Sequence, residues 1–282
     1  MERTSNYRNH HATLYLISTP IGNMEDITLR ALRTLKEVPI LFAEDTRVSQ
    51  KLLKHYEIDK PLQSLHEHNE MQKADWVLDH LAQGTDVGLM SDAGMPLMHD
   101  PGRLLVQKAL ESGYNVVCLP GANAALTGLV MSGIDPTPFY FAGFLDPKTT
   151  KRQTELRQIQ YRPETLVFYE APHRIQPFLK DILTVLGDRP ITILREMTKA
   201  FEETIRGKVS EILTIPDWKG ELVVVVAGYK ETDTSPAGTV VEQVDYFIRS
   251  GLSKTDAMKK VSEMTDIPKN EIYREYLDNT RH

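Results

Sequence analysis

The sequence predicts an α/β protein built from two α/β domains and a C-terminal helical extension. In the first half, short apolar runs alternate with helical patterns, which is typical of a parallel sheet covered by helices on both faces. In the second half the apolar runs indicate a mixed sheet, and residues 232–238 (TDTSPAG) have the composition of a linker. We expect a disordered tail over residues 1–12, domains over 13–121 and 122–231, and the extension over 236–282.

The first half contains five candidate strands. They are residues 13–18, 40–43, 62–65, 87–90 and 115–119. Asp26 and Thr28 are expected to open an amphipathic helix, because apolar residues then recur at helical spacing. These are Leu29, Leu32, Leu35 and Val38. Further helices are predicted over residues 71–81 and from Pro101 to about residue 112.

The second half begins near residues 136–138 (PTP). Strands are predicted at residues 139–142, 165–169 and 191–194, and a polar helix at 148–160. Residues 201–205 and 221–227 are expected to pair as strands, the latter being fully buried because it is continuously apolar. Three helical patterns follow the linker, at 240–249, 254–264 and 269–277. They suit either a helix-turn-helix-like unit or a plain helical tail, and Ser253 with Asp256 has the layout of a capping box.

Composition excludes several classes of protein. No apolar run reaches the roughly 18 residues of a membrane span, and the N-terminus lacks the apolar core of a signal peptide, so a cytoplasmic protein without membrane contact is expected. The single cysteine, Cys118, excludes a disulfide framework and lies in an apolar run where we expect it to be buried and inert. The net charge of −6 is unlike that of a general nucleic-acid binder, so any RNA contact must come from local basic patches.

Small and polar residues gather where the candidate strands end. The six strings are STPIGN, AEDTR, SDAGMP, PGANA, FYEAPHR and LREMTK. Ligands of open α/β sheets lie beyond the carboxyl ends of strands, where Gly94 would allow a close backbone approach and Asp92 would offer an acceptor. The alternatives are ordinary strand-to-helix turns and plain surface ion pairs, such as Asp45 with Arg47 or Glu170 with Arg174.

Familiar sites of other kinds are not indicated. Gly22 stands alone where a dinucleotide fold needs G-x-G-x-x-G, and no P-loop string is present. Residues 66–68 (HEH) could offer metal ligands, but without a third partner nearby a polar loop is favoured, and no metal is expected.

Taken as a series, these strings resemble the tetrapyrrole-methylase superfamily of S-adenosylmethionine (SAM)-dependent methyltransferases, the class III type. The likeness runs from about Leu14 to Gly228 and also includes ITLRAL, HDPG and GE-VVV-G. AEDTR and FYEAPHR are specific to the branch that methylates the ribose 2′-hydroxyl of a cytidine in 16S rRNA of the small ribosomal subunit. The chain differs from the common pattern at Met95, at Met98-His99 and at Ala122-Asn123.

The resemblance implies a homodimer with SAM held between two α/β domains. Carried over by position, the cofactor contacts would be Pro20, Ile21, Asp92, Gly94, Met95, Asn123, Ala124, Tyr169 and Ala227. A sulfonium methyl is already activated, so positioning can supply roughly 7–11 kcal/mol of the barrier. Because a ribose hydroxyl is a weak nucleophile, a nearby base would help, and the catalytic candidates are Glu44, Asp45, Glu170 and His173.

For the rRNA, we expect Arg47 and Arg174 to hold phosphate by charge-assisted hydrogen bonds. Further candidates lie on the polar helix and in the extension. They are Lys148, Lys151, Arg152, Arg157, Arg249, Lys254, Lys259 and Lys260. Two alternatives remain open: a methyltransferase acting on a small tetrapyrrole, and a non-catalytic SAM-binding protein that assists ribosome assembly.

Overall fold

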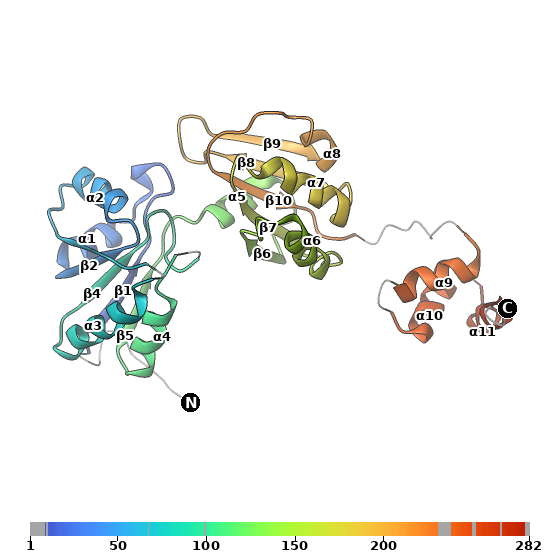
Figure 1. Ribbon diagram of the computed structural model, residues 1–282, viewed down its shortest axis with the longest axis horizontal. Coiled ribbons are helices and arrows are strands. Elements are labelled where there is room, and N and C mark those ends of the chain that lie inside the picture. The colour runs from blue at the N-terminus through green and yellow to red at the C-terminus, as the bar shows by residue number, and fades with distance from the viewer. Residues whose placement is uncertain are drawn as a thin grey trace. The chain divides into compact units, whose positions relative to one another are not determined.

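The computed structural model describes residues 9, 11–66, 68–98, 100–230, 238–249, 252–265 and 267–279 (Figure 1). The chain forms two compact units, Met1–Tyr229 and Lys230–His282. The expected tail over residues 1–12 lies outside the described residues except for Asn9, His11 and Ala12, and so does His99. Both α/β domains belong to the first unit.

The first sheet is parallel throughout, as predicted. Its strands are β1 (Thr13–Ile17), β2 (Ile40–Ala43), β3 (Leu62–Ser64), β4 (Val87–Met90) and β5 (Asn115–Leu119), in the order β3-β2-β4-β1-β5. Because all five strands run the same way, the loops after β1, β4 and β5 leave the sheet at one edge, as the ligand-site prediction requires.

Helices cover both faces of this sheet, and each face has its own buried apolar cluster. After a short 3-10 turn, η1 (Met24–Asp26), the helices are α1 (Leu29–Glu37), α2 (Thr46–His55), α3 (Glu70–Ala82) and α4 (Arg103–Glu111). The helix α2 was not predicted from the sequence. In α1 the buried residues are Ala31, Thr34 and Leu35, whereas Leu29 is 86% exposed. At 100° per residue, Leu29 lies on the side of the helix opposite Ala31, Thr34 and Leu35.

Cys118 is exposed, contrary to the prediction that it is buried. Its strand β5 is the last in the sheet, and neighbouring residues of a strand face opposite sides. Val117 and Leu119 lie on the buried side of β5, so Cys118 faces the opposite, exposed side.

The second sheet is mixed. Its strands are β6 (Phe139–Gly143), β7 (Thr165–Glu170), β8 (Pro190–Arg195), β9 (Glu203–Lys208) and β10 (Leu222–Val226). The order is β6-β7-β10-β8-β9, with β6 and β7 parallel and the other pairs antiparallel. The predicted pairing of residues 201–205 with 221–227 is wrong, because β8 lies between β9 and β10. The apolar β10 takes a central position, where both of its faces are buried.

The two faces of the second sheet are covered unequally. Side chains of α6 (Thr149–Gln158), α7 (Ile175–Leu186) and α8 (Val209–Ile212) pack with the sheet in one large core. On the other face a smaller cluster forms beneath α5 (Ala124–Ser132). Neither α5, α7 nor α8 was predicted.

The Lys230–His282 unit contains α9 (Val240–Arg249), α10 (Lys254–Thr265) and α11 (Lys269–Asn279), close to the three predicted helices. These helices share a buried cluster of their own, which includes Val244, Phe247 and Ile272. The backbone N–H of Asp256 donates to Ser253 Oγ (3.1 Å), as the capping-box layout predicted. Among the described residues, no helix is long and apolar enough to cross a membrane.

Candidate functional site

A pocket of about 340 Å³ opens in the Met1–Tyr229 unit, where loops of both sheets meet. The first sheet contributes the loops after β1, β4 and β5. The second contributes the ends of β6 and β7, the β8–β9 loop and the start of β10. Its wall is mainly apolar, and the described residues that line it include Asp100, Glu170 and Glu221 but no lysine, arginine or histidine. Glu170 pairs with Arg174 and Glu221 with Lys199, so the negative charge that faces a ligand is smaller than three carboxylates would give.

Gly94 brings the loops of the first sheet together. Its backbone exchanges two hydrogen bonds with Thr19, of 2.9 and 3.1 Å, and it has a φ of +84°. A Cβ atom at this position would lie 3.1 Å from Ile21 Cγ2 and 3.4 Å from the carbonyl oxygen of Ala122. The close approach predicted for Gly94 is therefore to the loops after β1 and β5, which form the wall of the pocket.

The loop after β4 is fixed at its far end by Glu70 of α3. One carboxylate oxygen of Glu70 accepts hydrogen bonds from the N–H groups of Gly102, Leu104 and Leu105, at 3.1, 2.7 and 3.2 Å. These are N–H groups at the start of α4 that have no partner within the helix. The carboxylate thus caps α4 from another helix and anchors the segment that carries Asp100.

Replacing Glu70 with alanine is expected to destabilise the first domain by about 1–3 kcal/mol, because buried N–H groups lose their acceptor. Urea unfolding followed by the fluorescence of Trp76, also on α3, measures this change. Glu111→Ala is the control, since Glu111 is exposed and accepts one bond from Gln107. Equal stability of the two variants would contradict the capping role.

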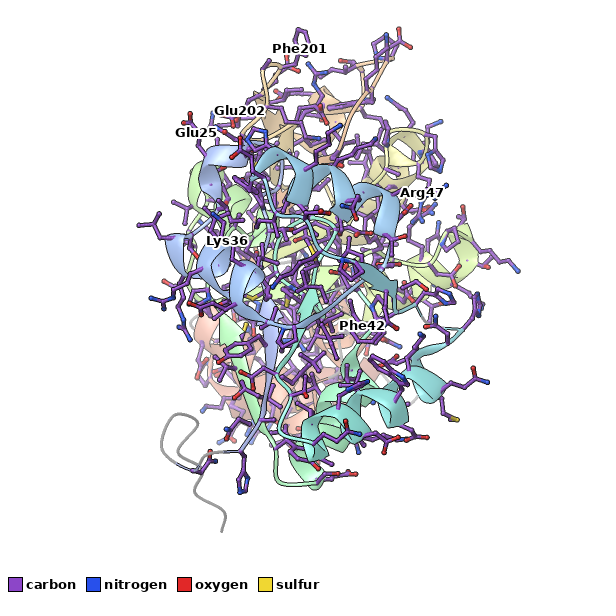
Figure 2. The ribbon with its side chains drawn as sticks, turned by 90° about the vertical axis from the view of Figure 1, so that its left-hand side faces the viewer. Glu25, Lys36, Phe42, Arg47, Phe201 and Glu202 are labelled. Carbon is purple, nitrogen blue, oxygen red and sulfur yellow. The ribbon has the colours of Figure 1, made fainter. Side chains whose placement is uncertain are left out.

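Asp92 joins two loops rather than lining the pocket. Its Oδ2 accepts from the N–H of Asp45 (2.9 Å) and its Oδ1 from Ser49 Oγ (2.9 Å). Asp45 in turn caps α2 and forms an ion pair with Arg47, whose side chain is 87% exposed and points outward (Figure 2). Hydrogen bonds from Arg47 lower the pKa of Asp45 to about 2, which makes Asp45 a poor proton acceptor at neutral pH.

Glu170 ends β7 at the pocket, and its side chain is fully buried beside Arg174 (Nε to Oε1, 3.0 Å). The N–H of Ala171 also donates to Oε1, at 2.8 Å. Burial raises the pKa of Glu170, while Ala171 and Arg174 oppose the rise. Arg174 Nη2 also donates to the carbonyl oxygen of Leu145 (2.7 Å) and so links the pocket wall to the segment after β6.

The β8–β9 loop supplies another wall of the pocket through Met197. Two residues of this loop that are not glycine, Glu196 and Thr198, have φ values of +51° and +67°. Lys199 Nζ holds the loop by donating to Glu196 (3.0 Å) and Glu221 (3.1 Å). Positive φ values in residues with side chains persist only where the surroundings enforce them, and such strain gathers at functional sites.

Of the nine predicted cofactor contacts, six line the pocket: Ile21, Gly94, Met95, Asn123, Ala124 and Tyr169. Pro20, Asp92 and Ala227 are not in its lining. Ala227 follows the end of β10, whereas the pocket lies at the start of β10, where Leu222 pairs with Glu170. The difference arises because β10 runs antiparallel to β7, so its carboxyl end points away from the site.

Of the four predicted catalytic residues, the structure places one at the pocket. Glu170 lines it, whereas Glu44, Asp45 and His173 do not, and both Glu44 and His173 are exposed. Sequence reasoning missed the pocket-lining roles of Asp100, Phe144, Met197 and Glu221. The motifs HDPG, LREMTK and GE-VVV-G contain three of these residues, but no signal in the sequence distinguished Phe144.

The residues predicted to contact RNA differ in their exposure and in their partners. Arg152 is buried (1% exposed) and bonded to Asp181, so its predicted contact with RNA is wrong. Arg174 is likewise engaged with Glu170. Exposed candidates are Arg47, Lys148, Lys151 and Arg157, together with Lys254 and Lys259 of α10. Lys254 and Lys260 lie over the rings of Tyr276 and Phe247, and the side chain of Arg249 lies outside the described residues.

Among the described residues, no group of three or more histidine, cysteine, aspartate or glutamate side chains could hold a metal ion. His66 and His68 lie with their ring centroids 5.9 Å apart. Glu67, the middle residue of the HEH string, is outside the described residues.

Comparison with known proteins adds independent information. A family profile described as Tetrapyrrole (Corrin/Porphyrin) Methylases matches residues 13–213. A Bacillus subtilis protein named ribosomal RNA small subunit methyltransferase I is 42% identical over 283 residues, which cover 96% of each chain. A protein of the same name from Halalkalibacterium halodurans is 41% identical, over 95% of this chain and 96% of its own.

Solved structures resemble this chain in fold. A diphthine synthase structure has a TM-score of 0.60 at 14% identity, covering 77% of this chain and 90% of its own. The uroporphyrin-III-C-methyltransferase of Thermus thermophilus has a TM-score of 0.54 at 21% identity, covering 76% of this chain and 94% of its own. At these identities the likeness extends to the two-domain α/β fold alone.

Proposed function

Because this chain belongs to the tetrapyrrole (corrin/porphyrin) methylases, we propose that it methylates the ribose 2′-hydroxyl of a cytidine in 16S rRNA, using SAM. The observation that carries this proposal is the 42% identity, over 96% of both chains, to a relative named for methylation of small-subunit ribosomal RNA. A reaction on ribosomal subunits takes place in the cytoplasm, where we place this protein.

The pocket suits SAM as the methyl donor. Its volume of about 340 Å³ lies in the range of small-molecule sites, and its mainly apolar wall suits an adenosyl group. Bound SAM supplies a methyl group that is already activated for transfer. The residues that would hold it are the six predicted contacts in the lining, together with Met197 and Val223.

The protein's own contribution is to position the ribose oxygen and to accept its proton. The loops around the pocket are fixed, which favours alignment of the ribose oxygen with the methyl group. Such positioning can supply roughly 7–11 kcal/mol of the barrier to methyl transfer. Of the predicted proton acceptors we retain Glu170, and we add Asp100, whose carboxylate lines the pocket and accepts from Ser91 Oγ (2.5 Å).

If Glu170 accepts the proton, its burial predicts the pH dependence. Burial raises the pKa of Glu170, so the ionised and active form is lost as pH falls through that raised value. We expect the acid side of the kcat profile to show this step and Glu170→Gln to remove it, with a loss of about 10²–10⁴-fold in rate. Asp100→Asn is the parallel variant. An unchanged profile in the folded Glu170→Gln variant would exclude Glu170 as the base.

The extension is proposed to bind RNA, because Lys254 and Lys259 of α10 are exposed. The 230–282 unit has its own core and the described pocket lining lies within residues 21–223, so SAM binding should not depend on the extension. Removing residues 236–282 is therefore expected to weaken binding to small subunits while leaving the Kd for SAM unchanged. Filter binding and calorimetry measure the two constants separately. Equal loss of both would mean that the extension supports the fold of the enzyme.

We also propose a homodimer. Among the described helices of the Met1–Tyr229 unit, α5 is the one that packs on this face of the second sheet, and it presents Leu126 and Val130, which are 47% and 76% exposed. A two-fold interface uses the same patch on both copies, so one exposed apolar helix face is sufficient. Light scattering should give twice the mass of 32.1 kDa, and a monomer would overturn this proposal.

The test of function is methyl transfer from labelled SAM to small subunits from cells that lack this protein, followed by mapping of the label. A label on one cytidine 2′-oxygen supports the proposal. No label on rRNA, with SAM binding confirmed by calorimetry, would overturn it. An assay with uroporphyrinogen as the acceptor then separates the two alternatives. Methyl transfer to it would indicate a tetrapyrrole methyltransferase, and no transfer would indicate a non-catalytic assembly factor.

A further inference from the structure

Phe144 is an aromatic residue at the mouth of the pocket. Its ring lines the pocket, yet it is 50% exposed. The ring meets Tyr169, another lining residue, edge-on with centroids 5.5 Å apart, and Tyr169 meets Phe141 in the same way at 5.1 Å. An apolar ring half open to solvent at a pocket mouth suggests a surface for a ligand larger than the pocket.

An irregularity in β6 turns Phe144 toward the pocket. Phe141 pairs with Val167, but the next partner, Phe168, pairs with Gly143, so β6 contains one extra residue. In a regular strand Phe144 would come opposite Glu170 and face the core beneath α6 and α7. The extra residue brings it beside Tyr169 instead, because a shift of one residue moves a side chain to the other face of a sheet. Gly143, with a φ of +66°, permits the turn.

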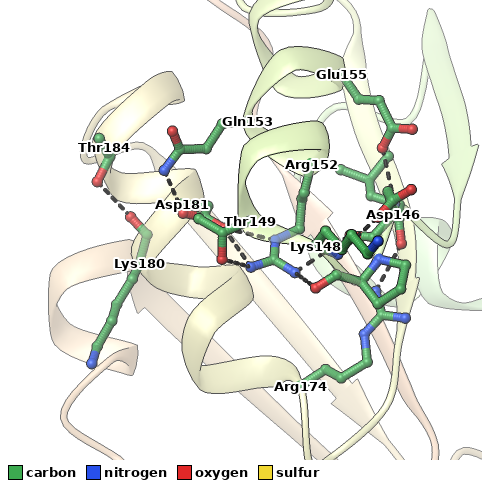
Figure 3. A network of polar contacts seen from close by, with 12 residues as sticks. Asp146, Lys148, Thr149, Arg152, Gln153, Glu155, Arg174, Lys180, Asp181 and Thr184 are labelled. Carbon is green, nitrogen blue, oxygen red and sulfur yellow. Dashed lines mark hydrogen bonds and ion pairs between the residues drawn. The ribbon is translucent and has the colours of Figure 1, made fainter.

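Two arginines then hold the segment that follows. Arg174 Nη2 donates to the carbonyl oxygen of Leu145 (2.7 Å). Arg152 Nη1 donates to the carbonyl oxygens of Asp146 (3.4 Å) and Pro147 (3.0 Å). Figure 3 shows the guanidinium group of Arg152 between this backbone and Asp181. Three successive carbonyl groups are thus fixed, so Phe144 is held in position before any ligand arrives.

The surroundings of Phe144 point to RNA as the ligand. The exposed Lys148 and Lys151 follow at the start of α6, where they can meet phosphate, although Lys151 Nζ also lies 3.6 Å from a carboxylate oxygen of Asp146. The pocket has room for one small molecule, so a nucleotide that presents its ribose to a cofactor in the pocket must keep its base outside. Unpaired RNA bases are commonly held by stacking on aromatic side chains.

We propose that Phe144 is the stacking surface for the base of the nucleotide that is methylated. This inference rests on the proposed function, because it places the target base at the mouth of the SAM pocket. The pyrimidine ring stacks on Phe144, and the ribose then points inward toward the cofactor. The same contact favours a nucleotide that is unstacked from its neighbours.

The test compares Phe144→Ala, Phe144→Tyr and Phe139→Ala. With labelled SAM and unmethylated small subunits, Phe144→Ala is expected to lower kcat/KM on the order of tenfold to a hundredfold, the usual effect of removing one stacking ring. Phe144→Tyr keeps the ring and should retain most of the activity. Phe139 begins β6 and is 39% exposed but does not line the pocket, so its alanine variant should match the wild type.

Two results would overturn the inference while leaving the function intact. If Phe144→Ala methylates subunits at the wild-type kcat/KM, the ring does not hold the base. If its Kd for SAM rises as much as kcat/KM falls, the ring belongs to the cofactor site. Calorimetry with SAM alone is expected to show a Kd within about threefold of the wild type. Failure of the wild-type protein to label the cytidine would instead contradict the proposed function itself.

Discussion

Replacing Arg152 with leucine is expected to destabilise the second domain by about 3–5 kcal/mol, because Asp181 would be left buried without its partner. Arg152 is 1% exposed, its Nε donates to Asp181 Oδ2 (2.7 Å), and Gln153 donates to the other oxygen (2.7 Å). Urea unfolding can be followed by the fluorescence of Trp218, which packs against this core, in a Trp76→Phe background. Without Arg152, the carbonyl groups of Asp146 and Pro147 also lose their hydrogen-bond donor.

Two further variants test the cause of this effect. Arg157→Leu removes an exposed arginine of the same helix and should change stability by no more than about 0.5 kcal/mol. Arg152→Leu combined with Asp181→Leu removes both charges and should recover much of the loss, since the unpaired carboxylate is then absent. A double variant as unstable as the single one would mean that the hydrogen bonds to the backbone dominate.

Replacing Gly94 with alanine is expected to reduce kcat/KM on the order of a hundredfold, because small displacements of positioning groups have effects of that size. Alanine at a φ of +84° is strained, and its Cβ would crowd Ile21 and the carbonyl group of Ala122. The three loops that Gly94 joins would then separate. The Kd for SAM, measured by calorimetry, should rise in parallel.

The control is Gly84→Ala, which carries the same backbone strain without the crowding. Gly84 has a φ of +79°, and a Cβ atom there would meet nothing within 4 Å. Both variants should lose about 1–2 kcal/mol of stability from the left-handed conformation. Only the variant at Gly94 should lose activity, and a similar loss at Gly84 would assign the effect to stability alone.

The sheets and the site region could be predicted because strands and their ends carry local signals. The run from Val87 to Met90 and the small residues after it placed both β4 and the pocket loop that contains Gly94. The sequence does not predict α7, because the polar string FYEAPHR directly before it indicates a crevice and not the start of a helix. In the structure Glu170 ends the strand at the pocket, and α7 begins five residues later.

The remaining differences depend on contacts that are distant in sequence. The antiparallel direction of β10 relative to β7 decides that Leu222, and not Ala227, lies at the pocket. Arg152 looked like a surface cation on a polar helix, because the matching Asp181 is 29 residues away. The sequence predicts that Asp92 meets a ligand, whereas its carboxylate oxygens accept hydrogen bonds from Asp45 and Ser49 at the start of α2.

The extra residue in β6 has a consequence for how sequences of this fold can vary. The orientation of Phe144 depends on its register with β7 and not on the number of residues in β6, because Phe141 and Gly143 pair with consecutive residues of β7. Deleting Ala142 would remove the irregularity but keep Gly143 opposite Phe168 and Phe144 beside Tyr169, so the ring would stay at the pocket. Among proteins of this fold, a strand one residue shorter at this point can therefore present the same ring, whereas regular pairing of Ala142 with Phe168 would turn Phe144 into the core beneath α6 and α7.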